Sequence, residues 1–286
     1  MALVALLALA GCADDAAPGA AVTVSGELGA VPELAYETPL VVEEASVELV
    51  WEGSGPRTQA GTPVLVDFLA ESGADGSVVN ETYSSEPRAD LLTPEVFGTD
   101  IFEALEGQRV GSRILLLAPA DPASGSSTVA VFDLLPTRAS GESVPRREGL
   151  PTVSLGDDGE PTVVVPETEP PTDLVVQPLL RGAGAQVAAG QVVTVQYVGV
   201  TWSDGAVVDS TWIAGKLPAS FPIGVGSVMA GWDAGLVEQT VGSQVLLVVP
   251  PALGYGGDHE LADETLVFVV DILSASGSPV SVENDA

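Results

Sequence analysis

The sequence predicts an α+β protein made of two copies of one domain, each a curved antiparallel β-sheet wrapped on one short α-helix. Three observations lead to this prediction. Strand-like apolar runs predominate, each half carries a single helix-like apolar stripe, and the glycine spacing of the first half recurs in the second. A sheet that has one apolar face and one helix to cover it is expected to curve around that helix, which is an α+β arrangement.

The duplication is clearest in two glycine-rich segments. EGSGPRTQAGTPVLVDFLAESGADGSVVNET, from Glu52, matches RGAGAQVAAGQVVTVQYVGVTWSDGAVVDST, from Arg181, at an unbroken offset of 129 residues. Farther along, VGSRILLLAP from Val110 matches VGSQVLLVVP from Val241 with two residues gained, and STVAVFDLL echoes ETLVFVVDIL. Chance similarity between valine-rich strands would not keep glycine spacing over this length. We infer an internal duplication of a domain of about 100 residues.

The elements of the second copy follow from its periodicity. Val193, Val195 and Tyr197 alternate on one face of a strand, and the Asp-Gly pair at 204–205 is a tight-turn signal. A short helix then has one face marked by Val228, Trp232 and Leu236. Strands are predicted over 245–249 and 265–273, and the last places four alternating residues on one face: Leu266, Phe268, Val270 and Ile272.

The N-terminus has the pattern of a secretory signal. Residues 1–10 are almost all Ala, Leu and Val, a run too short to span a bilayer, and they lead into Leu-Ala-Gly-Cys ending at Cys12. This ending resembles a bacterial lipobox, whose cysteine is lipidated, although no Lys or Arg precedes the apolar run. We expect Cys12 to anchor the chain to the outer face of the cell membrane. An ordinary signal with a chance cysteine is the alternative.

The predicted organisation combines these features. Two composition shifts, one rich in Ala and Gly and one rich in proline and acids, indicate connecting segments. A strand at a sheet edge remains possible for Thr162–Val165. The predicted segments are a lipoprotein signal peptide (1–12), a tether (13–39), a degenerate copy (40–139), a linker (140–171), a complete copy (172–275) and an acidic tail (276–286).

The charge of the chain excludes some partners. Nine Lys and Arg oppose 40 Asp and Glu, which gives a net charge of -31. Such a surface repels nucleic acid and anionic headgroups, so we expect no nucleic-acid partner and membrane contact through the lipid anchor alone. His259 is the only histidine and has no Cys or His nearby, so a solvated loop residue is expected and no metal.

The second copy resembles the FKBP-type peptidyl-prolyl cis-trans isomerases over about 179–273. The resemblance lies in VTVQYVG, DGAVVDST, FPIGVGSVMAGWDAGL, VGSQVLLVVPPALGYG and TLVFVVDIL, in this order. The proline-rich lead-in and the Asp-Ser-Thr-Trp stretch also look like the actinobacterial lipoprotein members of the family. The resemblance implies a cofactor-free isomerase that acts on proline-containing polypeptides and assists the folding of secreted or cell-envelope proteins. It adds rapamycin-type macrolides as candidate ligands.

The resemblance also assigns site residues. Trp232 would form the floor of an apolar pocket, with Tyr197, Phe221 and Phe268 as its walls. The remaining assigned residues are Val228 and Met229 at the rim, Asp209 as a carboxylate beside the wall tyrosine, and Tyr255 as a hydrogen-bond donor to the substrate carbonyl. Taken singly, the tyrosine, tryptophan and phenylalanine positions read as ordinary core. The joint pattern favours the pocket.

Two departures from the family pattern concern activity. Val208 stands where the family usually has a phenylalanine, and the loop GGDHELADE after Tyr255 lacks the usual Ile-Pro lip, which Leu261 would partly replace. The first copy lacks the site, with Phe68, Asn80 and Ile101 at the positions of Tyr197, Asp209 and Trp232. The sequence therefore predicts one catalytic copy and one folded, inactive copy, which is either a spacer or a client-binding module. A non-catalytic peptide-binding or chaperone-like lipoprotein is the competing hypothesis.

Overall fold

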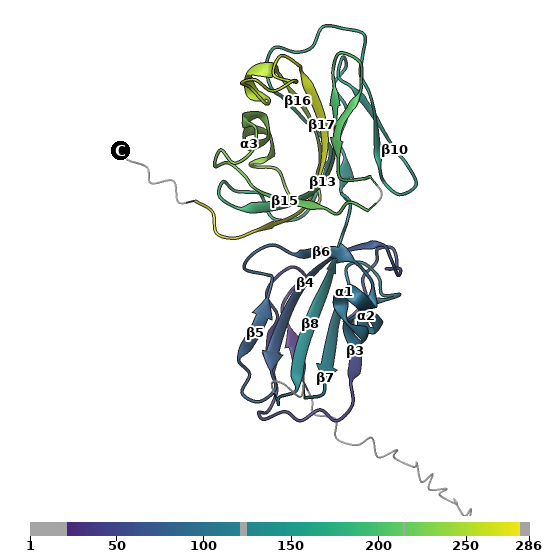
Figure 1. The fold of residues 1–286 in the computed structure, drawn as a ribbon, viewed down its shortest axis with the longest axis vertical. Coiled ribbons are helices and arrows are strands. Elements are labelled where there is room, and N and C mark those ends of the chain that lie inside the picture. Colours follow the sequence, from purple (N-terminus) through teal and green to yellow (C-terminus); the bar gives the residue numbers. More distant parts are fainter. Residues whose placement is uncertain (1–21, 121–124, 214, 281–286) are drawn as a thin grey trace, which may run out of the picture.

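The computed structural model describes residues 22–120, 125–213 and 215–280 of the 286-residue chain. Figure 1 shows two domains, with the first, in purple and teal, below the second, in green and yellow. Each domain contains one large antiparallel sheet and one or two short helices. This is the α+β arrangement that the sequence predicts. Cys12 lies outside the described residues.

The elements follow the repeat. The first domain contains β1 (Thr23–Ser25), β2 (Glu33–Ala35), β3 (Ser46–Trp51), β4 (Pro63–Ser72), β5 (Val78–Glu81), β6 (Arg88–Leu91), α1 (Pro94–Phe97), α2 (Thr99–Leu105), β7 (Arg113–Ala118) and β8 (Thr128–Leu135). The connecting segment and second domain contain β9 (Glu142–Ser143), β10 (Thr152–Leu155), β11 (Pro161–Val164), β12 (Val175–Arg181), β13 (Val192–Thr201), β14 (Val207–Ser210), β15 (Ala219–Pro222), α3 (Ala230–Leu236), β16 (Gln244–Val249), the short 3-10 helix η1 (Pro251–Leu253) and β17 (Leu266–Ser276).

The two large sheets have the same topology. The first has the strand order β3-β7-β8-β4-β5, with β6 also paired to β4. The second has β12-β16-β17-β13-β14, with β15 paired to β13 and β9 added beyond β12. Bulges recur at equivalent places, between Leu49 and Trp51 in β3 and between Pro178 and Leu180 in β12. The two domains therefore share the register of their strand pairing as well as the spacing of their glycines.

The repeated glycines mark places where two backbone segments touch. A Cβ on Gly53 would lie 2.2 Å from the Val110 carbonyl oxygen, and one on Gly182 would lie 2.1 Å from that of Val241. No side chain fits at these separations, which explains why both copies keep glycine there. The helix shows the same constraint, because a Cβ on Gly231 would lie 2.5 Å from a methyl group of Val249. Glycine thus brings α3 close to β16 and sets the depth of the space between helix and sheet.

The alternating residues occupy the faces that the sequence predicts. The concave face of the second sheet packs on α3, and its buried cluster includes Val193, Val195, Tyr197 and all four alternating residues of β17. The opposite face is buried too, under the hairpin of β10 and β11, where Val153 is buried and Val163 is partly buried. Both faces of the sheet are therefore covered, which accounts for the continuous apolar run of β16.

Parts of the segments predicted as a tether and a linker, within the described residues, are packed hairpins that belong to the repeat. In the first domain β1 and β2 pair Val24 with Leu34 behind the sheet, and β10 and β11 pair Val153 with Val163 in the same way. These pairs are again 129 residues apart (Val24 with Val153). Residues 22–39 and about 150–165 form packed hairpins, because the second face of each sheet needs an apolar cover. The strand expected at 162–165 is present, but it belongs to a separate two-stranded sheet.

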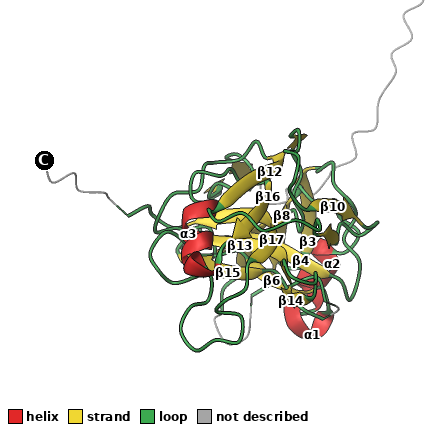
Figure 2. Ribbon diagram, turned by 90° about the horizontal axis from the view of Figure 1, so that it is seen from above, coloured by secondary structure: helices red, strands yellow, loops and turns green. Residues whose placement is uncertain are grey.

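The two domains touch through a small apolar cluster and the chain that joins them. Leu65 and Leu135 of the first domain pack with Leu273 of the second. The Ala139 amide donates a hydrogen bond to the Asp271 carboxylate at 2.8 Å. Viewed from above, α3 and the α1–α2 pair lie on different sides of the molecule (Figure 2). Among the described residues, no helix has the length and hydropathy needed to cross a membrane.

Candidate active site

Four aromatic rings meet between α3 and the concave face of the second sheet. Trp232, 4% exposed, lies on α3, and the rings of Tyr197, Phe221 and Phe268 surround it. Their centroids lie 5.1, 5.6 and 5.3 Å from the indole, at interplanar angles of 89°, 83° and 88°. Edge-to-face contacts of this kind fix ring orientation and add to the stability of apolar burial. The structure thus brings together the four residues predicted as floor and walls, whose catalytic roles stay predictions.

One glycine makes room for this cluster. A Cβ on Gly199 would lie 2.5 Å from the Phe268 ring, so the ring occupies the space that a side chain would need. Gly199 pairs with both Phe268 and Asp209, which places the ring and the carboxylate at one level of the sheet. Val208 is half-buried and packs at the edge of the same cluster. Its short side chain occupies the place predicted for contact with a proline ring.

The carboxylate of Asp209 is held on both oxygens. The Tyr197 hydroxyl donates to Oδ2, and the Lys216 ammonium donates to Oδ1 at 3.0 Å. Burial alone would raise the pKa of Asp209, but these two hydrogen bonds outweigh it and lower the pKa below its ordinary value. Burial and the bond to Asp209 raise the pKa of Tyr197. At neutral pH the pair is therefore a carboxylate and a protonated phenol.

Tyr255 stands at the mouth of the site, in the loop after η1. Its side chain is 40% exposed, and its ring stacks on the imidazole of His259 with centroids 4.1 Å apart. The His259 Nδ1 accepts a hydrogen bond from the Leu261 amide at 3.1 Å. Leu261 in turn packs against the aromatic cluster. The histidine is exposed, as predicted, and it also fixes the ring that carries the predicted donor hydroxyl.

The opposite rim is formed by the chain that enters α3. Val228 and Met229 are half-buried against the aromatic cluster. The carboxylate of Asp233 accepts hydrogen bonds from the amides of Gly224 and Gly226, at 2.7 and 2.6 Å. The helix therefore holds its own lead-in loop, and with it the rim.

Sequence reasoning missed three residues that support the site: Lys216, Asp233 and Gly199. A signal was available for the lysine, because Lys216 is the only lysine in the chain and follows Asp209 by seven residues. Gly199 depends on a contact with the distant Phe268, which no local pattern marks. Asp233 binds amides seven and nine residues before it, but an aspartate in a short helix is not by itself a signal for such a contact.

The first domain has lost this cluster more completely than the sequence predicts. The pairing of β4 with β8 and of β7 with β8 places Ala130 where the second domain has Phe268. The pairing of β4 with β6 places Asp90 where the second domain has Phe221. The four ring positions of the second domain, Tyr197, Phe221, Trp232 and Phe268, therefore correspond to Phe68, Asp90, Ile101 and Ala130.

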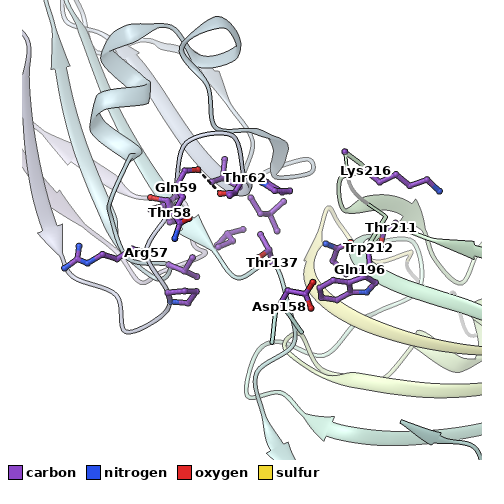
Figure 3. Close-up of a pocket in the computed structure, with 18 of the residues that line it drawn as sticks. Arg57, Thr58, Gln59, Thr62, Thr137, Asp158, Gln196, Thr211, Trp212 and Lys216 are labelled. Atoms are coloured by element: carbon purple, nitrogen blue, oxygen red, sulfur yellow. Dashed lines mark hydrogen bonds between the residues drawn. The ribbon is translucent and has the colours of Figure 1, made fainter. Parts of the chain in front are cut away.

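A cleft of about 410 Å³ also lies between the domains (Figure 3). Thr58, Gln59 and Thr137 border it on one side, and Gln196 and Trp212 on the other. Lys216 is at its edge, which places the cleft next to the Asp209 network but outside the aromatic cluster. Over residues 22–120, 125–213 and 215–280, no group of three or more His, Cys, Asp or Glu is arranged to hold a metal ion.

Comparison with known proteins covers the second domain. The family model described as FKBP-type peptidyl-prolyl cis-trans isomerase matches residues 184–273. The FK506-binding protein of Streptomyces anulatus is 40% identical over 120 residues, which are 40% of this chain and 96% of that protein. A probable FK506-binding protein of Corynebacterium glutamicum is 36% identical over 119 residues, 41% of this chain and 98% of that protein.

The solved structure of the three FKBP domains of wheat FKBP73 is also similar to this chain. It covers 82% of this chain and 95% of that chain at 20% identity, with a TM-score of 0.34.

Proposed function

Because this chain belongs to the FKBP-type peptidyl-prolyl cis-trans isomerases, we propose that its second domain isomerises proline peptide bonds in secreted or cell-envelope proteins and so assists their folding. Isomerase activity on proline-containing segments follows from the family. The extracytoplasmic role rests on the N-terminal sequence pattern. The inactive state of the first domain rests on the loss of its aromatic cluster. Rapamycin-type macrolides are proposed to compete with polypeptides for the pocket.

The chemistry needs no nucleophile, which suits a site without one. Rotation about a proline peptide bond has a barrier of about 20 kcal/mol because amide resonance is lost in the twisted state. A catalyst only has to bind the twisted amide better than the planar one. An apolar pocket does so by replacing the water that solvates the polar, planar amide. The buried ring cluster around Trp232 is the observation that carries the proposal.

The polar groups at the mouth are the proposed contacts to the substrate chain. The Tyr255 hydroxyl is the proposed donor to the carbonyl oxygen before the proline. Tyr197 and Asp209 form a charged hydrogen-bonded pair on the other side, held by Lys216. A carboxylate that is fixed on both oxygens presents a constant electrostatic environment to an amide as its charge distribution changes.

Substitution of the pocket floor tests the assignment. We expect Trp232→Ala to lower kcat/KM on a proline tetrapeptide by about tenfold to a hundredfold, about 1.4–2.7 kcal/mol of transition-state stabilisation. Ile101→Ala, at the equivalent position of the first domain, should leave kcat/KM unchanged. Folding must be checked by near-UV circular dichroism, because loss of a buried tryptophan costs about 3–5 kcal/mol of stability. Wild-type activity in a folded Trp232→Ala protein would refute the pocket.

The membrane anchor is tested separately. Lipidation at Cys12 is proposed from the Leu-Ala-Gly-Cys pattern, and more than one acyl chain is needed for stable binding. We expect Cys12→Ser to release the protein from the membrane fraction without changing its activity on a tetrapeptide. Equal partitioning of the variant and the wild type would contradict the anchor.

The competing function is a non-catalytic peptide-binding lipoprotein. The short side chain of Val208 and the missing Ile-Pro lip in the loop after Tyr255 favour it, because both reduce the apolar surface that grips a proline ring. The two functions differ in one measurement. A binding module would bind the tetrapeptide, as seen by tryptophan fluorescence, with no acceleration of its isomerisation.

A further inference from the structure

The first domain keeps an open apolar pocket where the second domain has its ring cluster. The pocket has a volume of about 510 Å³ and lies between the concave face of the sheet and the α1–α2 pair. Phe68, Phe97, Ile101 and Phe132 contribute most of its wall. The lining is largely apolar, and Phe97 is buried while Phe68 and Ile101 are half-buried. The pocket is therefore an apolar space between the sheet and the two helices.

The residue replacements explain why the space is open. Ala130 replaces the ring of Phe268, and its strand partner Ala70 replaces Gly199. The first domain thus has alanine where the second has the glycine that makes room for a ring, and it has a methyl group where the second has that ring. Asp90 and Ile101 replace two more rings, Phe221 and Trp232, while Phe68 keeps a ring at the position of Tyr197. Three rings of the second domain are thus absent here. Phe132 stands where the second domain has Val270 and, with Phe97, lines the volume of about 510 Å³ that stays open.

Arg88 closes one side of the pocket and is itself held in place. Its guanidinium lies 4.4 Å from the centroid of the Phe97 ring and donates to Asp90 at 3.1 Å. It also donates to the Val96 carbonyl at 3.1 Å. These contacts neutralise its charge and fix it as a flat wall rather than as a free cation. Arg88 therefore offers stacking surface, and the remaining charged residue of the lining is Asp100, an exposed carboxylate.

An acidic trough continues from the pocket towards the second domain. The trough has a volume of about 690 Å³, shares Phe68 and Arg88 with the pocket, and is also lined by Asn80, Glu81, Glu86, Pro218 and Ser220. Hydrogen bonds from Ser84 lower the pKa of Glu81, so its carboxylate stays ionised. The last two lining residues lie in or next to β15, the strand that carries Phe221 of the candidate active site. The trough thus connects the pocket to the catalytic domain.

We propose that the pocket of the first domain binds an aromatic side chain of an unfolded polypeptide, with a basic residue of the same segment in the trough beside Glu81 and Glu86. The proposal rests on the proposed function, because the polypeptide is the one whose proline the second domain isomerises. The apolar walls match an aromatic ring, and the trough supplies the complementary charge. The first domain would then hold a client by its side chain while the second acts on its backbone.

The test uses the full chain and a proline-free peptide, so that it does not depend on catalysis. The probe is an alanine-based peptide with one Phe and an adjacent Arg, and matched peptides carry Ser for Phe or Gln for Arg. Binding is followed by the methyl NMR signals of Ile101 and Leu116, which line the pocket. We expect the Phe peptide to bind, the Ser peptide to lose at least tenfold in affinity, and the Gln peptide to lose severalfold.

Variants that refill the pocket supply the decisive result. Ala70→Gly with Ala130→Phe rebuilds the glycine and ring pair of the second domain and should weaken binding of the Phe peptide at least tenfold. Ile101→Trp is a second refill in case the first does not fold. Glu86→Gln should weaken binding severalfold, whereas Glu95→Gln, on the exposed side of α1, should not. Unchanged binding to a folded refilled protein, or shifts confined to the Trp232 pocket, would overturn the proposal.

Activity on a proline tetrapeptide separates this proposal from the isomerase assignment. A tetrapeptide is too short to occupy both domains, so the refilled variants should keep wild-type kcat/KM. Loss of isomerase activity in Trp232→Ala with normal Phe-peptide binding would support both assignments independently. Isomerase activity without any Phe-peptide binding would leave the isomerase intact and refute the pocket proposal alone.

Discussion

The two domains share a backbone fold and differ in the side chains on the concave face of the sheet. Strand order, bulge positions and the glycines at close backbone contacts are common to both. The second domain fills its concave face with four rings and adds a carboxylate held by tyrosine and lysine, whereas the first leaves the face open. The comparison shows that the repeated positions specify the fold. The positions that differ decide between catalysis and another use of the same cavity.

A second difference lies on the opposite face of each sheet. In the first domain Arg113 is 0% exposed, and it pairs with Asp133 at 2.6 Å and donates to carbonyl groups in the turn between β1 and β2. The second domain has Gln244 and Asp271 at these positions, and the carboxylate accepts from Gln244 and from the Ala139 amide. The first domain thus uses a buried ion pair to hold its own hairpin. The second uses the equivalent aspartate to hold the chain that arrives from the first.

The largest effect should come from removing a hairpin. Without residues 140–171 the second domain would expose the apolar face that Val153 and Val163 cover, and it would lose the hydrogen bond from the Trp202 indole to the Thr168 carbonyl. Each newly exposed large side chain costs about 1.5–3 kcal/mol. The total rivals the stability of a whole domain, about 5–15 kcal/mol. We expect residues 140–286 to unfold cooperatively in urea and residues 172–286 to lack a cooperative transition. Equal midpoints would show that the hairpin is not part of the domain.

Exchange of the ion-pair residue should have the next largest effect. Arg113→Gln gives the first domain the residue that the second domain uses, but leaves Asp133 buried without its cation. Breaking a fully buried pair in this way costs about 3–5 kcal/mol. Gln244→Ala, its counterpart, removes a hydrogen bond of about 1 kcal/mol. Urea unfolding measures both. A loss below 1 kcal/mol for Arg113→Gln would mean that water or the hairpin turn replaces the cation.

The sequence predicts the repeat, the two large sheets and the residues of the ring cluster, because glycine spacing and alternation are local and survive in one chain. It misassigns residues 22–39 and about 150–165 as tether and linker. Each hairpin has only a few apolar residues among Gly, Pro and acids, and what makes it structural is the uncovered sheet face behind it. Likewise, Ala130 reads as an ordinary strand residue until the strand register shows that it occupies the position that Phe268 has in the second domain.

A smaller effect, on the pH dependence of the free energy of unfolding, is expected from two buried aspartates. Burial raises the pKa of Asp67 and of Asp271 to about 6, from the ordinary value of 3.8. The folded protein therefore binds protons that the unfolded chain has released. The stabilisation is complete below about pH 4 and is lost as the pH rises through 6, by up to about 3 kcal/mol per group.

Variants assign this pH dependence to the two domains. Asp67→Asn should flatten the free energy of unfolding between pH 4 and 7 for the first domain, and Asp271→Asn should do so for the second. Asp209, whose pKa is lowered, contributes in the opposite direction, with stability lost as the pH falls through its folded pKa. Curves that keep their slope in both Asn variants would show that other groups set the dependence.

The smallest effect is expected from a substitution at the mouth of the catalytic pocket, where the second domain has Tyr255 and the first has no equivalent tyrosine. Tyr255→Phe removes one hydroxyl and keeps the ring that stacks on His259. If that hydroxyl holds the substrate carbonyl, its loss costs about 1 kcal/mol, a severalfold fall in kcat/KM. His259→Ala keeps the Tyr255 hydroxyl but removes the imidazole on which the Tyr255 ring stacks. The hydroxyl would then be less well positioned, and we expect a smaller fall in kcat/KM than for Tyr255→Phe. Both effects should be well below that of Trp232→Ala, since a hydrogen bond at an exposed mouth competes with water and a buried ring does not. A Tyr255→Phe loss as large as that of Trp232→Ala would move the main source of catalysis from the apolar floor to the hydroxyl at the mouth.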